Sequence, residues 1–500
     1  MVSDRVLIIN GVKFKNHNIS DHSIATRGES MEISIDVGEI GKFVGKYSLG
    51  RDNGENSLHF LRIKIPAGQI DSERLRKIAE LSRKYGKGYA EVTDRQSIQL
   101  HWIDSDNALE IFERLYEIGY TTDMCGQAFS GACMGDVRNI VTCPLSGKIS
   151  EFDVSELSKR LTEFFTGNPE YLDLPRKFKI ALTGCGGDCV RLGINDLGMY
   201  GIIHNGERGY APFAGGSIGA SFPGPTIAKP LGIFIPESQA FEFVKAVVEI
   251  HRDFSSRESK AKARFKNLVN KWGIERLREE IERKTGMEYE RIEISNPKPS
   301  DHNGHGIQAD GLYYYTLPVL GGVLSAEKLD FIADMAEKHG SGEVRLTPEQ
   351  NVTFVDVSDV DVLKRDLSRV FEIRESKLRY SSIGCASNFC GKTKEPHAKD
   401  MLQKLVEFCE SRGVEDVSIF ISGCRNACGC HHVGEIGLVG RAVRAGNGVS
   451  QGYDLLYGGS FTELKLAKIW KEGLYGDDLF REFEKVLEVV RNGAKTEADK

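Results

Sequence analysis

The chain has 500 residues, a length at which a large apolar core forms without support from disulfides or metals. Its 66 Lys and Arg against 72 Asp and Glu give a net charge of −6, which excludes a polybasic nucleic-acid binder and an acidic disordered chain. No apolar run approaches the roughly 18 residues of a membrane span, and the N-terminus has no signal-peptide pattern. We therefore expect a cytoplasmic protein with neither a nucleic-acid nor a membrane partner.

Residues 1–57 have no counterpart later in the chain and are interpreted as an N-terminal extension. Beyond them the sequence repeats, because residues 63–100 and 317–354 align at a constant offset. Each copy predicts a strand, an amphipathic helix and a second strand, which is half of a ferredoxin-like unit. We place the two half-repeats at residues 58–120 and 311–375. The matched positions include Gly68 with Gly322, Gly86 with Gly340, and Gln96 with Gln350.

A second pair of similar segments follows in the same order. TGCGGDCVRLGINDLG begins at Thr183 and SGCRNACGCHHVGEIG begins at Ser422. Two blocks repeated in order indicate a duplication of about half the chain. We predict an α+β fold in which the two half-repeats are joined by two α/β cofactor-binding domains. These domains span residues 121–286, which end in charged connecting helices, and 376–500, with a polar linker at 287–310.

The first copy carries cations where the second does not. It contains TDRQ, GDVRN and LPRKFK, and the last of these includes Lys177 and Lys179. If this segment is a strand, the two lysines lie on one face, because side chains alternate along a strand. Two neighbouring ammonium groups repel unless an anion lies between them or carboxylates surround them. The ordinary alternative is a pair of solvated lysines at a sheet edge.

The second copy is dominated by cysteine. The chain has 11 cysteines, an odd number, and without a secretion signal this does not indicate a disulfide framework. Two close pairs stand out: Cys385 with Cys390, and Cys424 with Cys428. Four thiolates suit tetrahedral zinc or an iron–sulfur cluster, and these gaps differ from the usual zinc knuckle, which favours the cluster. Burial of some of these cysteines as structural residues is the other alternative.

The order of TDRQ, GDVRN, LPRKFK and the two cysteine pairs resembles the sulfite/nitrite reductase family over residues 58–440. The resemblance implies the duplicated fold of that family, with sirohaem and one [4Fe–4S] cluster as cofactors. It implies a six-electron reduction of a small oxyanion at the sirohaem iron. Because no flavin or nicotinamide domain is evident, the electrons are expected from ferredoxin or a similar small donor.

The family's functional positions carry over to named residues. The implied anion-binding, catalytic cations are Arg95, Arg138, Lys177 and Lys179. The implied cluster ligands are Cys385, Cys390, Cys424 and Cys428, and Cys428 also bridges to the sirohaem iron. The expected cofactor contacts are Gln96, Asn139, Gly215, Gly216 and Asn426. Two departures stand out: the Cys385–Cys390 gap is one residue shorter than is usual in the family, and Cys430 could compete with Cys428 as the bridge.

The preferred substrate depends mainly on Lys179. Nitrite reductases of the family tend to have Asn there, and a second ammonium group suits a dianion, so we predict reduction of sulfite to sulfide. The alternatives are nitrite reduction to ammonia, a corrin-biosynthesis oxygenase of the same fold, and a cluster-bearing electron carrier. In the first half, Cys133, Cys143, Cys185 and Cys189 are expected to be mostly structural, and a second cluster there is the less favoured alternative.

Overall fold

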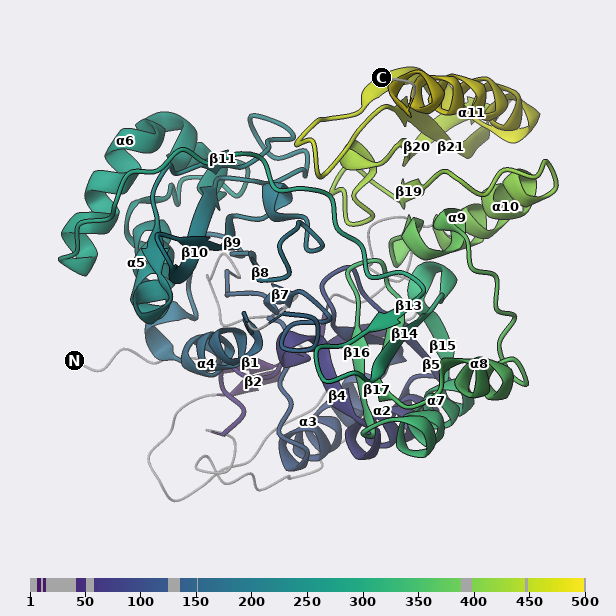
Figure 1. Ribbon diagram of the computed structural model, residues 1–500, viewed down its shortest axis with the longest axis horizontal. Helices are drawn as coiled ribbons and strands as arrows, with labels where there is room; N and C mark the ends of the chain where they lie inside the picture. The colour runs from purple at the N-terminus through teal and green to yellow at the C-terminus, as the bar shows by residue number, and fades with distance from the viewer. Residues whose placement is uncertain are drawn as a thin grey trace.

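The structure is a computed structural model of the chain (Figure 1). It describes residues 7–9, 12–14, 42–50, 58–124, 135–150, 152–387, 398–445 and 448–498. The predicted ligand Cys390 and the first-half Cys133 lie outside the described residues. Within the described part, no helix combines the length and apolar character needed to cross a membrane.

The two half-repeats form one body by exchanging strands. One antiparallel sheet has the order β15 (Val323–Ser325), β5 (Tyr89–Val92), β6 (Ile98–Ile103) and β3 (His59–Ile63). The other has the order β13 (His305–Ile307), β14 (Tyr313–Leu317), β17 (Val352–Val357), β16 (Glu343–Leu346) and β4 (Gln69–Asp71). Strand β15 of the second repeat pairs with β5 of the first, and β4 of the first pairs with β16 of the second. Each repeat therefore completes the sheet of the other.

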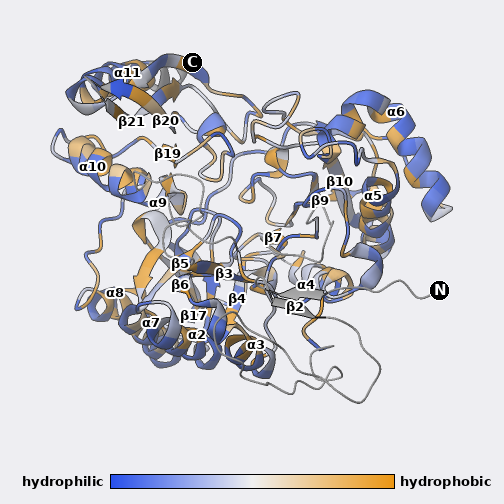
Figure 2. Cartoon of the chain, turned by 180° about the vertical axis from the view of Figure 1, so that it is seen from behind, coloured by the Kyte–Doolittle hydropathy of each residue, from blue (hydrophilic) through white to orange (hydrophobic). Residues whose placement is uncertain are grey.

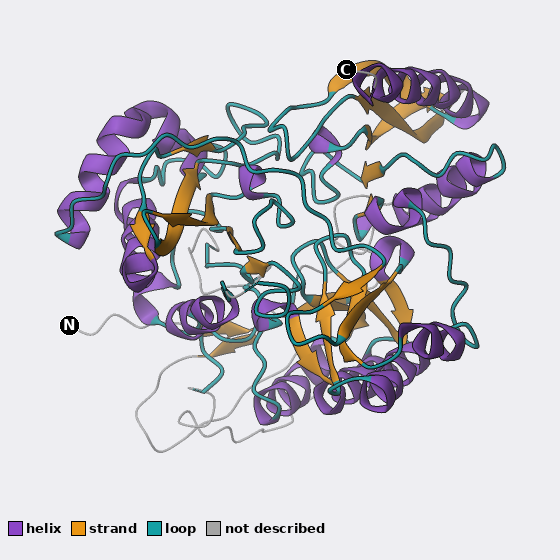
Figure 3. Cartoon of the chain, in the orientation of Figure 1, coloured by secondary structure: helices purple, strands orange, loops and turns teal. Residues whose placement is uncertain are grey.

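Helices α2 (Ser72–Tyr85) and α7 (Ala326–His339) pack side by side on the outer side of these sheets (Figure 3). Helix α2 begins after Asp71, whose carboxylate accepts a 2.8 Å hydrogen bond from a backbone N–H of its first turn. Ser325 caps α7 in the same way. Arg76 of α2 forms ion pairs at 2.7 Å with two carboxylates of α7. The equivalent helices of the two repeats thus form a single layer.

The two remaining units have the same sheet topology. The first half contributes β7 (Val141–Thr142), β8 (Ile180–Thr183), β9 (Leu197–His204), β10 (Glu207–Ala214) and β11 (Lys229–Pro230), with β12 (Ile235–Pro236) also paired to β10. The second half contributes β18 (Ile383–Gly384), β19 (Ile419–Ser422), β20 (Ile436–Ala445), β21 (Gly448–Tyr457) and β22 (Lys468–Leu474). In each, the first three strands are parallel and the next two are antiparallel to their neighbours. The duplication seen in the sequence is therefore also a duplication of topology.

The remaining helices pack against the sheets of the half-repeats or of the two other units. They are α3 (Ala108–Glu117), α4 (Ser155–Phe165), α5 (Ala240–Phe254), α6 (Phe265–Thr285), α8 (Val360–Leu367), α9 (Lys377–Ser381), α10 (Ala398–Glu410) and α11 (Gly476–Ala498). A short antiparallel pair, β1 (Leu7–Ile9) and β2 (Val12–Phe14), stands apart from the other sheets. The half-repeats, the first-half unit and the second-half unit each enclose an apolar core.

The charged segment that follows the first-half sheet is more than a solvated connection. Helix α6 is interrupted at Gly273, whose φ of 77° lies in the left-handed region. Before this kink, Phe265, Leu268 and Val269 pack into the first-half core. Beyond it Leu277 and Ile281 also pack into this core, and the helix is otherwise largely hydrophilic where it projects from the body (Figure 2). The sequence therefore predicted the helix, and its packing on both sides of the kink is an addition from the structure.

Candidate active site

One pocket is lined by residues of both halves of the chain, and we call it the cationic pocket. It holds about 1550 Å³ of space, counting the part open to solvent. Six cationic side chains line it: Arg62, Arg95, Arg138, Arg176, Lys177 and Lys179. The second half contributes Cys385, Cys424, Asn426 and Cys428. Only three acidic residues share the lining, namely Glu91, Asp94 and Asp123, so the pocket favours an anion.

Two of the predicted arginines are held in place by neighbouring groups. Arg95 lies in the turn between β5 and β6, and its guanidinium donates to Asn195 Oδ1 at 2.9 Å and to Asn139 O at 2.7 Å. Arg138 Nε lies 3.0 Å from Asp136 Oδ1. Both side chains are buried. Such fixed guanidinium groups can present their remaining N–H donors to an oxyanion with little reorganisation.

Lys177 and Lys179 lie on the same wall of the cationic pocket. Phe178 between them is fully buried in the first-half core, so the two lysines point the other way. Among the described residues, no carboxylate oxygen lies within 4.0 Å of either ammonium group. Burial, together with the charge of Lys179, lowers the pKa of Lys177 to about 7. Burial also lowers the pKa of Lys179. The pair therefore has the character of a partly desolvated anion site and not of solvated edge lysines.

Three of the four predicted cluster cysteines come together in the pocket. Cys385 directly follows β18, and Cys424 and Cys428 follow its parallel neighbour β19. The backbone N–H of Gly423 donates to Cys385 Sγ at 3.1 Å, a contact that would stabilise a thiolate.

Cys430 is oriented differently from Cys428. The Cys428 thiol is exposed, whereas Cys430 is buried and its thiol donates to Asp94 Oδ2 at 3.7 Å. Burial raises the pKa of Cys430 to about 12, which disfavours the thiolate that a metal requires. Cys430 also lies outside the lining of the cationic pocket.

One predicted cofactor contact, Gln96, holds the protein together instead of lining the pocket. Gln96 is fully buried: its amide donates to Thr142 O at 2.8 Å and Leu346 O at 2.7 Å, and accepts from Thr142 N–H at 2.7 Å. Its repeat counterpart Gln350 donates to Val92 O at 3.1 Å and accepts from Gly384 N–H at 3.2 Å. Each glutamine therefore ties a half-repeat turn to the first strand of a neighbouring sheet and to the other repeat.

Asn139 and the glycine loop have similar structural contacts. Asn139 Nδ2 donates to Ile65 O at 3.0 Å and to Arg95 O at 2.9 Å. A Cβ on Gly216 would overlap the Gly193 carbonyl oxygen, and one on Gly215 would lie 3.0 Å from Val269. These glycines thus allow close packing of the protein against itself. Among the predicted cofactor contacts, Asn426 and Cys428 are the ones in the pocket lining.

Sequence reasoning missed two cations of the pocket. Arg176 belongs to the LPRKFK block, and its carbonyl oxygen is 2.8 Å from His251 Nε2. Arg62 lies on β3, and its Nε donates to Gln99 Oε1 on β6 at 2.8 Å. Arg176 could have been found by its place beside the two lysines. Arg62 has no such signal, because only the pairing of β3 with β6 brings it to the pocket.

The residues present fit a sirohaem and a [4Fe–4S] cluster. Cys385, Cys424 and Cys428 in the pocket lining would hold a cluster, and the lining cations would pair with the carboxylates of a macrocycle and with an oxyanion. Lys177 and Lys179, which the described residues leave without a carboxylate partner, are the observation on which this fit depends.

Comparison with known proteins agrees with this geometry. Residues 133–289 match the nitrite and sulphite reductase 4Fe-4S domain, and residues 51–118 and 306–369 match the nitrite/sulfite reductase ferredoxin-like half domain. The assimilatory ferredoxin-dependent nitrite reductase of Haloferax mediterranei is 32% identical, over 84% of this chain and 76% of its own length. The sulfite reductase [ferredoxin] of Mycobacterium tuberculosis is 28% identical, over 82% of this chain and 74% of its own. The solved structure of the Mycobacterium tuberculosis NirA protein has a TM-score of 0.78 at 26% identity, covering 88% of this chain and 85% of that one.

The chain belongs to the nitrite and sulfite reductase family. It is an oxidoreductase with sirohaem and one [4Fe–4S] cluster as cofactors. The family resemblance, the duplicated α+β fold and the cofactors predicted from the sequence are thereby confirmed.

Proposed function

We propose that this chain reduces sulfite to sulfide in a six-electron reaction, with electrons delivered by ferredoxin or a similar small donor. The support comes from Lys177 and Lys179, two ammonium groups on one pocket wall with no carboxylate within 4.0 Å among the described residues. A dianion such as sulfite gains more than a monoanion from a second nearby cation, because Coulomb energy scales with the product of the charges. Lys179 is thus the residue that favours sulfite.

The pocket cations are proposed to have two roles, binding of the oxyanion and donation of protons. When bound, sirohaem and the cluster supply the electrons and the iron at which the oxyanion is reduced. Arg95 and Arg138 hold the oxyanion oxygens through fixed N–H donors. Lys177 Nζ donates protons, since a pKa of about 7 lets an ammonium group give up its proton near neutral pH. Each oxygen that leaves as water needs two protons, so a rechargeable donor is required at this wall.

Cys385, Cys390, Cys424 and Cys428 are proposed as the cluster ligands, with Cys428 shared between cluster and sirohaem iron. Three features support this. Cys385, Cys424 and Cys428 line one pocket, the Gly423 N–H stabilises a thiolate at Cys385, and the exposed Cys428 faces the space that Cys430 does not reach. Asn426, in the same turn, is proposed to contact the macrocycle.

Nitrite reduction to ammonia is the second candidate, because the names of the relatives are divided between the two activities. The Haloferax mediterranei relative and the ferredoxin–nitrite reductase of Synechococcus elongatus, 31% identical, carry that activity in their names. Steady-state assays with reduced methyl viologen and each anion separate the two. We expect a higher kcat/KM for sulfite. A higher kcat/KM for nitrite would overturn the assignment.

A further inference from the structure

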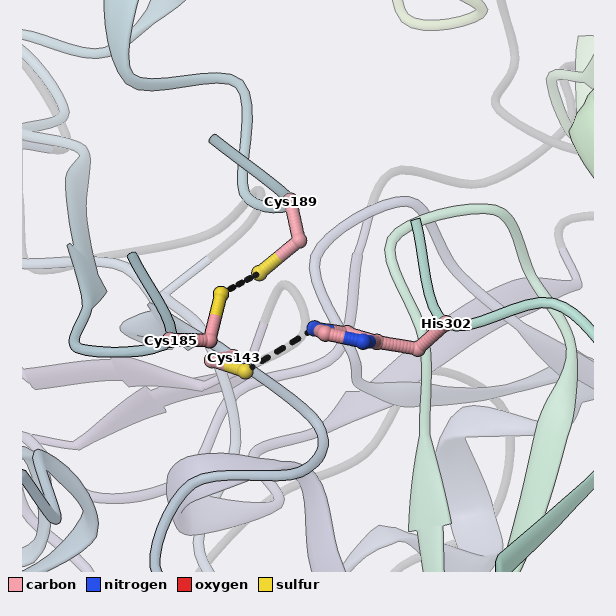
Figure 4. Close-up of side chains that lie close together, drawn as sticks. All are labelled: Cys143, Cys185, Cys189 and His302. Atoms are coloured by element: carbon pink, nitrogen blue, oxygen red, sulfur yellow. Dashed lines mark hydrogen bonds between the residues drawn. The ribbon is translucent and has the colours of Figure 1, made fainter. Parts of the chain in front are cut away.

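Four metal-binding side chains gather in the first half, outside the lining of the cationic pocket. They are Cys143, Cys185, Cys189 and His302, and their ligand atoms all lie within 4.8 Å of one another (Figure 4). Cys185 Sγ is 3.6 Å from Cys189 Sγ, and Cys143 Sγ is 3.2 Å from His302 Nε2. An S–S bond is about 2.05 Å, so the cysteine pair is not a disulfide. Within the described part of the chain, no other set of three or more His, Cys, Asp or Glu ligand atoms is this close.

The fold brings these four residues together from three separate segments. Cys143 directly follows β7, and Cys185 and Cys189 follow β8, its parallel neighbour, so they meet at one edge of the sheet. His302 arrives on the segment that precedes β13. This segment is fixed against the β8 loop by a 2.8 Å hydrogen bond from Asp188 N–H to Lys298 O. The approach requires glycine at position 187, because a Cβ there would overlap Ser300.

The surroundings can support thiolates, and they hold the backbone of His302 in place. Thr183 Oγ1 lies 3.3 Å from Cys185 Sγ and 3.7 Å from Cys189 Sγ; its hydroxyl donates to Gly187 O at 3.0 Å and could turn to donate to one of the two sulfurs when they are thiolates. The backbone of His302 is held by Thr316, whose hydroxyl donates to His302 O at 2.6 Å. Cys143, Cys189 and His302 are buried and Cys185 is half-buried, so the set is largely shielded from solvent.

We propose that Cys143, Cys185, Cys189 and His302 bind one tetrahedral zinc ion. Zinc bonds of about 2.3 Å to sulfur and about 2.0–2.1 Å to nitrogen place neighbouring ligand atoms about 3.5–3.8 Å apart in a tetrahedron. The 3.6 Å and 3.2 Å separations are close to these values. Four protein ligands close the coordination shell, which makes the zinc structural. It joins the segment that leads into the second half-repeat to the sheet of the first half.

An iron–sulfur cluster is the main competing occupant. Because the two sheets share one topology, Cys143, Cys185 and Cys189 occupy the places that Cys385, Cys424 and Cys428 hold in the second half. They also lie within the stretch that matches the 4Fe-4S domain. In a four-iron cluster each thiolate binds a different iron, so its ligand atoms spread around the cluster. Here four ligand atoms within 4.8 Å surround the space of a single ion.

Metal analysis of the purified holoenzyme tests the proposal directly. We expect about one zinc per chain in addition to the roughly five irons of sirohaem and one [4Fe–4S] cluster. X-ray absorption at the zinc edge should show three sulfur neighbours near ~2.3 Å and one nitrogen near ~2.0 Å. A content of about nine irons per chain and no zinc would show that the site holds a second cluster, and it would overturn the zinc assignment. Absence of any metal beyond the five irons would overturn the site altogether.

Variants separate this site from the catalytic one. His302→Ala should lose most of the zinc while the iron content stays at the wild-type level. His302→Cys offers a fourth thiolate and should retain zinc, which guards against simple misfolding of the alanine variant. Cys409→Ser, at a buried cysteine of α10 apart from this cluster, is the matched control and should keep one zinc. An unchanged zinc content in His302→Ala would show that His302 is not a zinc ligand, and it would overturn the proposed four-residue site. These readouts do not depend on which anion the enzyme reduces.

Discussion

Lys177 and Lys179 flank the fully buried Phe178 on one wall of the cationic pocket, and the charge of Lys179 adds to burial in lowering the pKa of Lys177 to about 7. In the function proposed above, Lys179 provides charge that favours a dianion, and Lys177 is held in a range where it can exchange a proton.

The first prediction concerns substrate preference. Lys179→Asn removes one of the two ammonium groups and should lower kcat/KM for sulfite by about tenfold or more, since losing about 1.4 kcal/mol of transition-state stabilisation has that effect. The value for nitrite should fall less, because a monoanion gains less from the second charge. Steady-state kinetics with both anions measure this. Equal losses for the two anions would show that Lys179 does not select between them.

The same substitution should move the pH profile. If Lys177 donates protons, activity declines as pH rises through its pKa, because the deprotonated amine has no proton to give. Removing the positive charge of Lys179 relieves the like-charge repulsion and raises the pKa of Lys177. The alkaline limb of the kcat profile should therefore shift to higher pH in Lys179→Asn. A shift to lower pH, or none, would contradict the proton-donor role of Lys177.

The fold class and the duplication could be predicted because both follow from patterns within short stretches of the sequence. Matched glycines and apolar spacing identify two copies of one unit. The sequence could not predict that the copies exchange β4 and β15, since that pairing joins residues far apart in the chain. Local spacing also suggested that Lys177 and Lys179 share a face, and the burial of Phe178 explains why.

The role of a residue was harder to predict from the sequence where its motif also makes structural contacts within the protein. Gln96 lies inside the TDRQ block, yet its amide is taken up by backbone groups, as is that of Gln350 in the other repeat. The first-half cysteines Cys143, Cys185 and Cys189 were expected to be mostly structural, and the proposed structural zinc extends that expectation. Their neighbour His302 could not be found from the sequence, because it lies in a polar segment whose path no local pattern reveals.

The structural role of Gln96 gives a further prediction. Gln96→Ala leaves the buried Thr142 N–H without its acceptor and should lower the free energy of unfolding by about 1–3 kcal/mol. The KM for the anion should change little, because Gln96 lies outside the pocket lining. Chemical denaturation and steady-state kinetics provide the two measurements. A large increase in KM with unchanged stability would contradict this prediction and show that Gln96 acts in the active site.

The bridging cysteine can be tested by absorption spectroscopy. Cys428→Ser should abolish the spectral coupling between sirohaem and cluster, because it removes the proposed shared sulfur. Cys430→Ser is the matched control two residues away, and it should retain the coupled spectrum since Cys430 is turned toward Asp94. If the two variants exchanged these outcomes, Cys430 would be the bridge.

His251, which contacts the backbone of the pocket-lining Arg176, should make the stability of the protein depend on pH. Its Nδ1 lies 2.7 Å from Ser255 Oγ and its Nε2 2.8 Å from Arg176 O, and burial lowers its pKa to about 4. In the unfolded chain this histidine binds a proton as the pH falls below about 6.5, whereas in the folded chain it stays neutral there. Its contribution to the free energy of unfolding is therefore fully present above about pH 6.5. It falls as pH drops from about 6.5 to about 4, by up to about 3 kcal/mol.

Replacing the imidazole should remove this dependence. His251→Gln keeps polar atoms in the cavity but does not titrate, so its thermal midpoint should change less between pH 7 and pH 5 than that of the wild type. Parallel slopes for wild type and His251→Gln would mean that another group titrates in this range.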